Sequence, residues 1–413
     1  MAVTGTGLAV PIGLGAEQAW RRSVCGESGI GALRRFDTSG YACAAGAEVP
    51  PFALDGLRLA KNEKFMNTAV RCAMRAAREA VASSGADLAR FDPYRVALYA
   101  GSGQTGLESA EMFRALELEW TGEVEKDFAS MGGRAARLLD RYFSLRSLAN
   151  AGLGLISAEL GIMGPSDNFV QGDTASALAL LAALDDLAEG RVDLALVGGF
   201  ESLLTVSTFL AYDKAGLLSP SEPSRAYRPF DCERDGIVLG EGAGFLVLER
   251  EEDARRRGAE VAALVLGAGL AMESVDASEA KAYTAAMRAA VADATDAAVD
   301  LVVAHGIGTT EGDRREARLI SELIDPGVPV TAYKSQTGYL GAASAAVELS
   351  LTVETLRRGC VAPIARHALA DPACTLNLVT GRARPLPKRG ATALCLSWSW
   401  LGQCAAVALR AVA

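Results

Sequence analysis

The organisation of this chain is most evident between Arg228 and Glu249, where the sequence is RPFDCERDGIVLGEGAGFLVLE. The stretch ends in an apolar run that is typical of a buried strand. The charge-dense EREEDARRRGAE, which starts at Glu249, predicts an exposed helix, and AALVLGAGLA from Ala262 predicts a second apolar strand that restarts the α/β pattern. No low-complexity linker intervenes. We therefore expect two units, residues 1–250 and 251–413, that are variants of one design and share a core.

Short apolar strands alternate with longer Ala/Leu/Arg-rich stretches along the chain, which is typical of layered α/β architecture with largely parallel sheets. Three strand segments are alike, because each is a continuous apolar run that breaks at glycine: RVALYAGSG from Arg95, VDLALVGGFES from Val192 and DLVVAHGIGTT from Asp300. Such runs predict strands covered on both faces, and α/β proteins place their sites at the carboxyl ends of such strands. Helices are predicted over residues 67–84, 174–189, 280–292 and 342–358.

Composition narrows the class of protein. The 413 residues are 50% hydrophobic and 22% charged, so the chain can bury a large core in about two or three domains. A net charge of −9 without a long Lys/Arg run argues against nucleic acid or an anionic membrane as the main partner. The N-terminal residues lack the pattern of a signal peptide. Eight scattered cysteines favour a reduced, cytoplasmic protein, and two histidines argue against a His/Cys zinc site.

Two further stretches match a functional pattern but are better explained by ordinary structure. The uncharged segment from Thr392 to Leu409 contains Ser, Gly and Gln, so we interpret it as two buried strands joined by a polar turn, not as a membrane span. The segment GSGQTG, from Gly101 to Gly106, matches G-x-G-x-x-G, but no convincing βαβ unit with an acidic ribose ligand surrounds it. We interpret it as a loop that brings backbone close to an apolar ligand or a partner subunit, and we expect no cofactor.

The quoted stretch, together with VDLALVGGFES, VVAHGIGTTEGD and YKSQTGYLGAASAAVE, resembles the β-ketoacyl synthase branch of the thiolase superfamily. The match is collinear over essentially the whole chain, as far as SWSWLGQCAAVAL at 397–409. The resemblance implies a thiolase-like α/β fold with two fused βαβαβαββ halves in a five-layer αβαβα arrangement, and a dimer. It also implies condensation of acyl thioesters on acyl carrier protein, for which the family uses a cysteine nucleophile and two histidines.

The residue at the family's nucleophile position is not a cysteine. In the family it lies nine residues after the glycine of a Gly-Pro-Ser element, and counting from Gly164 gives Asp173. No cysteine occurs between Cys72 and Cys232. We interpret Asp173 as a helix N-cap, because a helix N-terminus that favours a thiolate also favours a carboxylate. A catalytic carboxylate is the alternative, but its attack on a thioester would give a more reactive mixed anhydride.

The family's other catalytic positions are only partly kept. His305 matches the first histidine and Lys334 the lysine of the next motif, and we expect one of them to pair with Asp173. Tyr339 stands in place of the second histidine. These four positions are therefore expected to be vestigial. Asp313 and Glu316 match the acidic positions after His305, whereas His367 matches no catalytic motif and is interpreted as a loop histidine.

A ketosynthase-like chain without a nucleophile resembles the chain-length factor, or β subunit, of type II polyketide synthases. The resemblance implies a heterodimer with an active ketosynthase, acyl carrier protein as the carrier of the chain, and an interior that extends the polyketide tunnel. On the helix expected after GSGQTG, the candidate tunnel residues are Ser109, Met112 and Leu116, with Phe113 as a nearby alternative. Trp398 and Trp400 lie in the expected gate loop.

Three other functions stay open at this stage. The chain could be an acyl-carrier-protein-dependent decarboxylase, although Tyr339 in place of a histidine argues against that chemistry. It could be an acyltransferase or hydrolase that uses Ser176 with His305 as general base, although no G-x-S-x-G element supports it. It could also be a homodimeric scaffold, which a one-to-one complex with a ketosynthase would exclude.

Overall fold

The computed structural model describes residues 1–103, 140–272, 280–386 and 388–412. The main strands are β1 (Ala2–Val10), β5 (Val96–Ser102), β6 (Ser166–Phe169), β7 (Leu194–Ser202), β8 (Glu241–Glu249), β9 (Ala263–Met272), β10 (Leu301–Val303), β11 (Pro329–Thr331), β15 (Thr392–Trp398) and β16 (Gln403–Ala411). Short strands are β2 (Gly13–Leu14), β3 (Gly31–Ala32), β4 (Ala45–Gly46), β12 (Cys360–Val361), β13 (Asn377–Leu378) and β14 (Arg384–Pro385).

The helices connect these strands. They are α1 (Ala16–Val24), α2 (Thr68–Ser83), α5 (Phe143–Arg146), α6 (Ala151–Leu160), α7 (Ala175–Ala188), α8 (Val206–Lys214), α9 (Glu251–Arg256), α10 (Ala280–Ala294), α11 (Thr310–Leu323), α12 (Lys334–Thr337) and α13 (Ser344–Arg358). Short 3₁₀ segments are η1 (Ala60–Phe65), η2 (Leu88–Arg90), η3 (Pro93–Arg95), η4 (Gly172–Thr174) and η5 (Gly341–Ala343). The two 3₁₀ segments η4 and η5 directly precede α7 and α13.

One topology occurs twice in the main sheet. The first half has the order β6-β5-β7-β8-β1, and the second has β11-β10-β15-β16-β9, with β13 added outside β11. In both halves the first three strands are parallel and the last two pair antiparallel. The half-sheets join where β1 pairs with β9, with Ala2 opposite Leu264 and Val3 opposite Ala263. The expectation of two variants of one unit is therefore confirmed.

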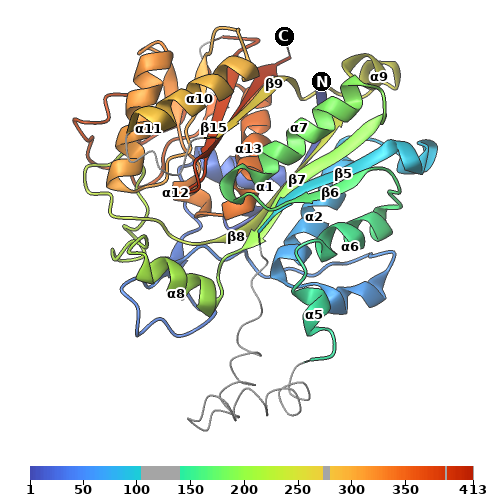
Figure 1. Ribbon diagram of the computed structural model, residues 1–413, viewed down its shortest axis with the longest axis horizontal. Helices are drawn as coiled ribbons and strands as arrows, with labels where there is room; N and C mark the ends of the chain where they lie inside the picture. Colours follow the sequence, from blue (N-terminus) through green and yellow to red (C-terminus); the bar gives the residue numbers. More distant parts are fainter. Residues whose placement is uncertain (104–139, 273–279, 387, 413) are drawn as a thin grey trace.

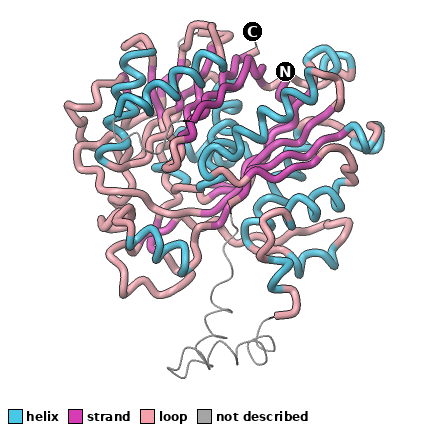
Figure 2. Tube along the Cα trace, in the orientation of Figure 1, coloured by secondary structure: helices cyan, strands magenta, loops and turns pink. Residues whose placement is uncertain are grey.

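Helices cover the half-sheets in layers (Figures 1 and 2). Helix α13 contacts β1, β7 and β8 of the first half as well as β15 and β16 of the second, and α7 contacts strands of both halves too. These two helices form the middle layer, while α2 and α6 lie outside the first half and α10 and α11 outside the second. Separate core clusters fill the middle of the molecule and its two outer interfaces. The predicted thiolase-like, five-layer α/β fold is confirmed.

The local predictions agree with the observed elements. The four predicted helices correspond to α2, α7, α10 and α13, and the side chain of Asn67 caps α2 by accepting a hydrogen bond from the Val70 N–H. The charge-dense segment forms α9. The uncharged C-terminal segment forms the antiparallel pair β15–β16, because its alternate residues pack on both faces of the sheet. No helix among the described residues has the length and apolar character that crossing a membrane requires.

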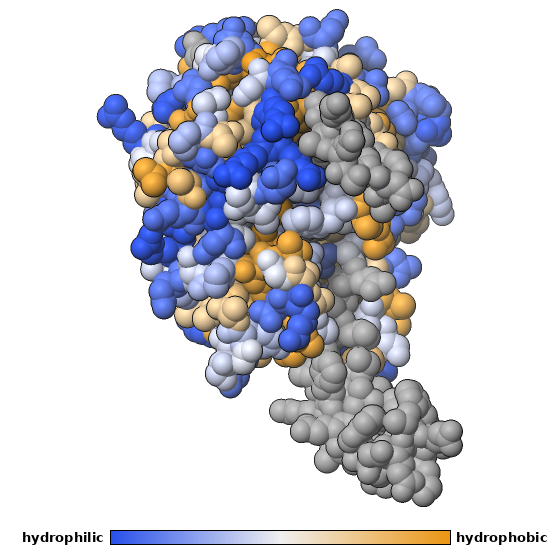
Figure 3. Space-filling view, turned by 60° about the vertical axis from the view of Figure 1, so that its left-hand side comes forward, coloured by the Kyte–Doolittle hydropathy of each residue, from blue (hydrophilic) through white to orange (hydrophobic). Residues whose placement is uncertain are grey.

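Figure 3 shows hydrophilic residues over most of one face of the molecule, with a group of hydrophobic residues in its lower half. All eight cysteines are free thiols. The two ends of the chain lie on the same side of the molecule (Figure 1).

Candidate active site

The repeated topology brings the candidate residues together in the interior. Asp173 lies in η4, between β6 and α7, and Tyr339 lies just before η5, the equivalent segment of the second half. The two 3₁₀ segments contact each other because α7 and α13 are paired in the middle layer. His305 follows β10 and Lys334 follows β11, at the carboxyl ends of neighbouring parallel strands. Each of the four side chains is at most 2% exposed.

Asp173 binds Tyr339. The Tyr339 hydroxyl donates a hydrogen bond of 2.8 Å to Oδ2 of Asp173, whereas Oδ1 of Asp173 has no partner. The expected N-cap is wrong: the residue at the cap of α7 is Thr174, and no side chain caps that helix. The expected partner is wrong too, since neither His305 nor Lys334 forms an ion pair or hydrogen bond with Asp173.

Burial dominates the electrostatics of Asp173. Loss of solvent raises the pKa of this carboxyl to about 6, against smaller opposing effects of the Lys334 charge and the Tyr339 hydrogen bond. The same burial raises the pKa of the Tyr339 phenol, and the nearby Asp173 carboxylate raises it further. Tyr339 is therefore a neutral hydrogen-bond donor at neutral pH. Its single proton is engaged by Asp173.

Lys334 is held in a buried ion pair. Its Nζ lies 2.6 Å from Oε1 of Glu348 on α13, and it also donates to the carbonyl oxygen of His305 at 2.8 Å. Burial raises the pKa of the Glu348 carboxyl to about 7, while the Lys334 charge opposes that rise. The ion pair therefore fixes the Lys334 ammonium against the His305 loop and not against Asp173.

The geometry around Lys334 sets the tautomer of His305. Nζ of Lys334 lies 3.2 Å from Nδ1 of His305, and because an ammonium can only donate, Nδ1 accepts and the imidazole proton resides on Nε2. Burial, and then the Lys334 charge, hold the pKa of His305 well below its usual range, so the ring is neutral. Nε2 is buried and without a partner. His305 thus presents one free N–H donor within the site.

Two buried carboxylates hold the His305 loop. Glu316 on α11 accepts hydrogen bonds from the backbone N–H groups of His305 and Gly306, at 2.6 and 2.8 Å. Asp313 accepts from the N–H groups of Gly308 and Phe230, at 2.9 and 2.7 Å. Burial raises the pKa of Glu316 to about 8 and that of Asp313 to about 6. Both residues position the loop.

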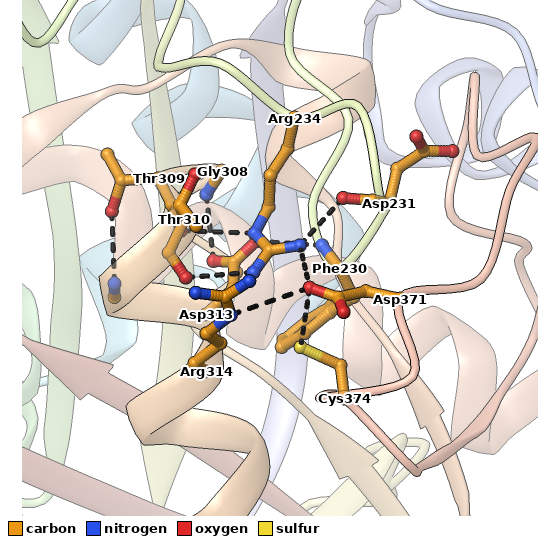
Figure 4. A network of polar contacts seen from close by, with 12 residues as sticks. Phe230, Asp231, Arg234, Gly308, Thr309, Thr310, Asp313, Arg314, Asp371 and Cys374 are labelled. Atoms are coloured by element: carbon orange, nitrogen blue, oxygen red, sulfur yellow. Dashed lines mark hydrogen bonds and ion pairs between the residues drawn. The ribbon is translucent and has the colours of Figure 1, made fainter.

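Arg234 connects this loop to the segment quoted first (Figure 4). Its guanidinium donates to the carbonyl oxygens of Thr309 and Thr310, which end the His305 loop. It also pairs with the carboxylates of Asp371, at 2.7 Å, and Asp313, at 3.4 Å. The residues between Arg228 and Glu249 thus stabilise the site as well as supplying β8.

Trp398 of the expected gate loop covers the imidazole of His305. The two ring centroids are 4.7 Å apart, and the ring of Trp400 packs edge-on against Trp398 at 5.6 Å. Trp398 is 8% exposed and Trp400 43% exposed, so the aromatic contacts lead from the surface to the buried histidine. A Cβ atom at Gly172 would lie 3.6 Å from Ser399 Oγ, which places the same loop beside η4.

The sequence interpretation missed two members of the site. The ring of Tyr212 on α8 packs against the ring of Tyr339, with centroids 5.9 Å apart, and burial raises the pKa of the Tyr212 phenol. Glu201 at the end of β7 is 2% exposed, and burial followed by the Asp173 charge raises its pKa to about 7, against hydrogen bonds from the Ser202 and Gly103 N–H groups. The position of Glu201 at the carboxyl end of an apolar strand was a usable signal, whereas nothing in the sequence marked Tyr212.

Other predicted residues lie apart from this cluster or outside the described residues. The Ser176 hydroxyl donates to the carbonyl oxygen of Ala342, so Ser176 and His305 do not form a nucleophile–base pair. His367 lies in a loop after β12. The predicted tunnel residues Ser109, Met112, Phe113 and Leu116 all lie outside the described residues.

The donor set fits neither thiol nor metal chemistry. No cysteine thiol contacts Asp173, His305 or Lys334, and burial raises the pKa of Cys395, on β15, to about 12. In the described part of the chain, no group of three or more His, Cys, Asp and Glu side chains could hold a metal ion. Around Asp173 the side chains offer the free Nε2–H of His305, the engaged phenol of Tyr339 and the carboxyl of Asp173 itself, while the Lys334 ammonium is paired with Glu348.

Comparison with known proteins identifies the family to which this chain belongs. A model of the beta-ketoacyl synthase N-terminal domain matches residues 1–254, and a model of the C-terminal domain matches 259–367. A Streptomyces cyaneus protein named putative polyketide beta-ketoacyl synthase 1 is 32% identical, over 93% of this chain and 92% of its own length.

Two solved structures have the same fold over the whole chain. The ishigamide ketosynthase/chain length factor has a TM-score of 0.86 at 27% identity, and it covers 100% of this chain and 99% of its own. A type II PKS acyl-carrier protein in complex with its ketosynthase has a TM-score of 0.84 at 25% identity, with the same coverage. The two family models, the curated relative and the shared fold agree with the motifs read from the sequence: this chain belongs to the β-ketoacyl synthase family.

Proposed function

We propose that this chain is a catalytically inactive ketosynthase-like subunit, a chain-length factor, that pairs with an active ketosynthase and shapes the polyketide tunnel in type II polyketide biosynthesis. The observation that carries the proposal is Asp173, a buried carboxylate at the nucleophile position, hydrogen-bonded to Tyr339 at 2.8 Å. A carboxylate cannot hold an acyl chain as a thioester. The acyl group must then reside on another chain.

The remaining donors are too few for the condensation. Stabilising the charge that develops on a thioester oxygen requires positioned donors. His305 offers a free Nε2–H, but the only proton of Tyr339 is engaged by Asp173. Half of the donor pair that the family uses is therefore lacking, which supports a structural role for the site.

Two structural neighbours support the choice of partner. One neighbour is a ketosynthase/chain length factor, and the other is an acyl-carrier protein bound to its ketosynthase. We extend both relationships to this chain: an active ketosynthase is its heterodimer partner, and acyl carrier protein brings the growing chain to the pair. The division at residue 250 and the tunnel residues Ser109, Met112, Phe113 and Leu116 remain predictions within this proposal.

The test is reconstitution with a candidate ketosynthase. The two chains are co-expressed, purified, and supplied with malonyl-loaded acyl carrier protein. The products are then weighed against those of the ketosynthase alone. We expect a one-to-one heterodimer, a product of defined length from the pair only, and no acyl adduct on this chain by intact-mass spectrometry. A covalent adduct on this chain, or elongation by it without a partner, would contradict the proposal.

The unpartnered Nε2–H of His305 favours one second candidate function. A single donor aimed at a thioester carbonyl could assist decarboxylation of malonyl-loaded acyl carrier protein. In that case the isolated chain would convert malonyl-loaded to acetyl-loaded carrier protein, and His305→Ala would abolish the conversion. No conversion above the uncatalysed rate would exclude this function.

A further inference from the structure

Three buried polar atoms around Asp173 have no partner in the described part of the chain. They are Oδ1 of Asp173, Nε2 of His305 and the hydroxyl of Tyr227. Each of these side chains is at most 1% exposed, so bulk solvent does not reach it. A buried polar atom without a hydrogen bond is costly, and nearly all such atoms in folded proteins are paired. The three atoms therefore point to a partner that the chain itself does not supply.

The three side chains border one region of the interior. The ring of Tyr227 packs on the loop after His305, because a Cβ atom at Gly308 would lie 2.7 Å from that ring. Burial raises the pKa of the Tyr227 phenol, and charges that include that of Asp173 raise it further. Burial and then the Lys334 charge lower the pKa of His305, and the same charge opposes the larger effect of burial on Asp173. These mutual influences belong to groups that lie close together.

A strained backbone holds Tyr227 in this region. The φ angle of Tyr227 is 63° and that of Phe230 is 60°, in the left-handed region that residues other than glycine rarely adopt. Both rings are fully buried, and a Cβ atom at Gly306 would lie 3.5 Å from the Phe230 ring. Strained residues of this kind gather at binding sites. The strain at Tyr227 brings an additional hydroxyl beside the His305 loop.

Charge and hydrogen-bonding capacity decide what the partner is. The Asp173 carboxylate disfavours an anion, whereas the Lys334 ammonium and the Nε2–H of His305 disfavour a cation. At neutral pH the Nε2–H can only donate, Oδ1 of Asp173 can only accept, and the Tyr227 hydroxyl can do both. The partner is therefore neutral and both donates and accepts, which describes water. A thioester carbonyl only accepts, so it would leave the Asp173 oxygen unpaired.

We propose that Asp173, His305 and Tyr227 together bind internal water molecules at the position where an active family member holds its acyl thioester. The site is inferred without reference to the polyketide, but its consequence rests on the proposed function. A thioester that entered this chain would displace water from Asp173 and could not replace the hydrogen bond that the water donates, which weakens its binding. The hydrated site thus helps to keep the acyl chain on the partner subunit.

A high-resolution crystal structure of the full chain tests the occupant. We expect ordered water at about 2.6–3.2 Å from Nε2 of His305, from Oδ1 of Asp173 and from the Tyr227 hydroxyl. A second crystal, soaked in rubidium bromide, reveals ions by their anomalous scattering. A rubidium or bromide peak among these three atoms overturns the proposal. So does a direct hydrogen bond between Tyr227 and Asp173 with no density between them.

The stability of Tyr227→Phe tests the same site in solution. A hydroxyl that binds water leaves that water one partner short when it is removed, so the equilibrium constant for unfolding in urea should rise about fivefold to tenfold. Removing a hydroxyl without a partner would leave the constant unchanged or lower it, which overturns the proposal. Tyr94→Phe is the matched control, because Tyr94 is 67% exposed and its hydroxyl should matter little.

Neither measurement involves a partner subunit or a polyketide product. The hydrated site can therefore be refuted while reconstitution confirms the chain-length function, and the reverse result is equally recognisable.

Discussion

The Tyr339 hydroxyl donates a hydrogen bond to Oδ2 of Asp173 across 166 residues of sequence, at 2.8 Å. The two residues lie in or next to equivalent segments of the two halves, Asp173 within η4 and Tyr339 just before η5, ahead of the helices of the middle layer. In an active condensing enzyme a thiol and an imidazole would meet there. Here a carboxylate and a phenol lie at that position and are hydrogen-bonded to each other, so both groups are engaged within the chain.

Removing the phenol hydroxyl should destabilise the protein in a pH-dependent manner. Tyr339→Phe leaves the buried Asp173 carboxylate without its only side-chain donor, which costs about 1–3 kcal/mol at pH 8. At pH 5 the carboxyl is largely protonated and the loss should be smaller, because its pKa is raised to about 6. Urea unfolding of both proteins at pH 5 and pH 8 measures this loss of stability. Tyr333→Phe is the control, since Tyr333 bonds the neutral Thr355; equal losses at both pH values for Tyr339→Phe would contradict the account.

Asp173→Asn should stabilise the protein increasingly as the pH rises. The folded pKa of about 6 lies above the ordinary value of 3.8, so the favourable contribution of Asp173 is complete below 3.8 and is lost as the pH passes 6. The amide resembles the protonated acid, and the gain should reach about 3 kcal/mol at pH 8. Denaturant titrations from pH 5 to 8 test this, with the exposed Asp296→Asn as control. If the free energy of unfolding of Asp173→Asn exceeds that of the native protein by a constant amount at all pH values, or falls below it, the raised pKa of Asp173 is refuted.

The contributions of Lys334 and Glu348 to the free energy of unfolding should be strongly coupled. Lys334→Met leaves a buried carboxylate unpaired and should cost about 3–5 kcal/mol. The double variant Lys334→Met/Glu348→Gln removes both charges and should be much more stable than the sum of the single losses predicts. A double-mutant cycle by urea unfolding gives the coupling energy. Additive losses would show that the 2.6 Å contact contributes no specific pairing energy.

Product length should respond to Ser109 if the predicted tunnel helix is correct. Ser109→Trp adds bulk to the expected floor, so the reconstituted pair should release a shorter polyketide, which mass spectrometry of the products measures. Glu111→Trp is the matched control, because residue 111 lies about 200° around the same predicted helix. Shortening by both substitutions, or by neither, would count against the assignment.

Strands and helices were predictable where hydrophobic periodicity alone determines them. The run that forms β7 is apolar from Leu194 to Phe200 because both faces of that strand are covered, and helix α2 begins at its Asn67 cap as expected. The same patterning explains why the uncharged C-terminal segment forms β15 and β16 and not a membrane helix. At these positions the local sequence pattern was sufficient to predict the secondary structure.

Contacts between distant segments were not predictable in the same way. The sequence placed Asp173 before a helix, but its choice of Tyr339 over Lys334 depends on Glu348, which holds the ammonium from α13. The packing of Trp398 on His305 likewise depends on how β10 and β15 lie side by side. The pKa of about 7 at Glu201 arises mainly from burial, which no local pattern reports.

The pairing of β1 with both β8 and β9 has a consequence for synthesis. β1 is buried along its whole length, yet apart from the short β2, which pairs only with Ala9 and Val10, its first partner strand begins at Glu241, roughly 230 residues later. At ribosomal rates of about 5–20 residues per second, most of this strand waits on the order of ten seconds or more for a hydrogen-bonding partner. Nascent chains are thus exposed to aggregation until β8 emerges, and yield in a heterologous host should depend on chaperone supply.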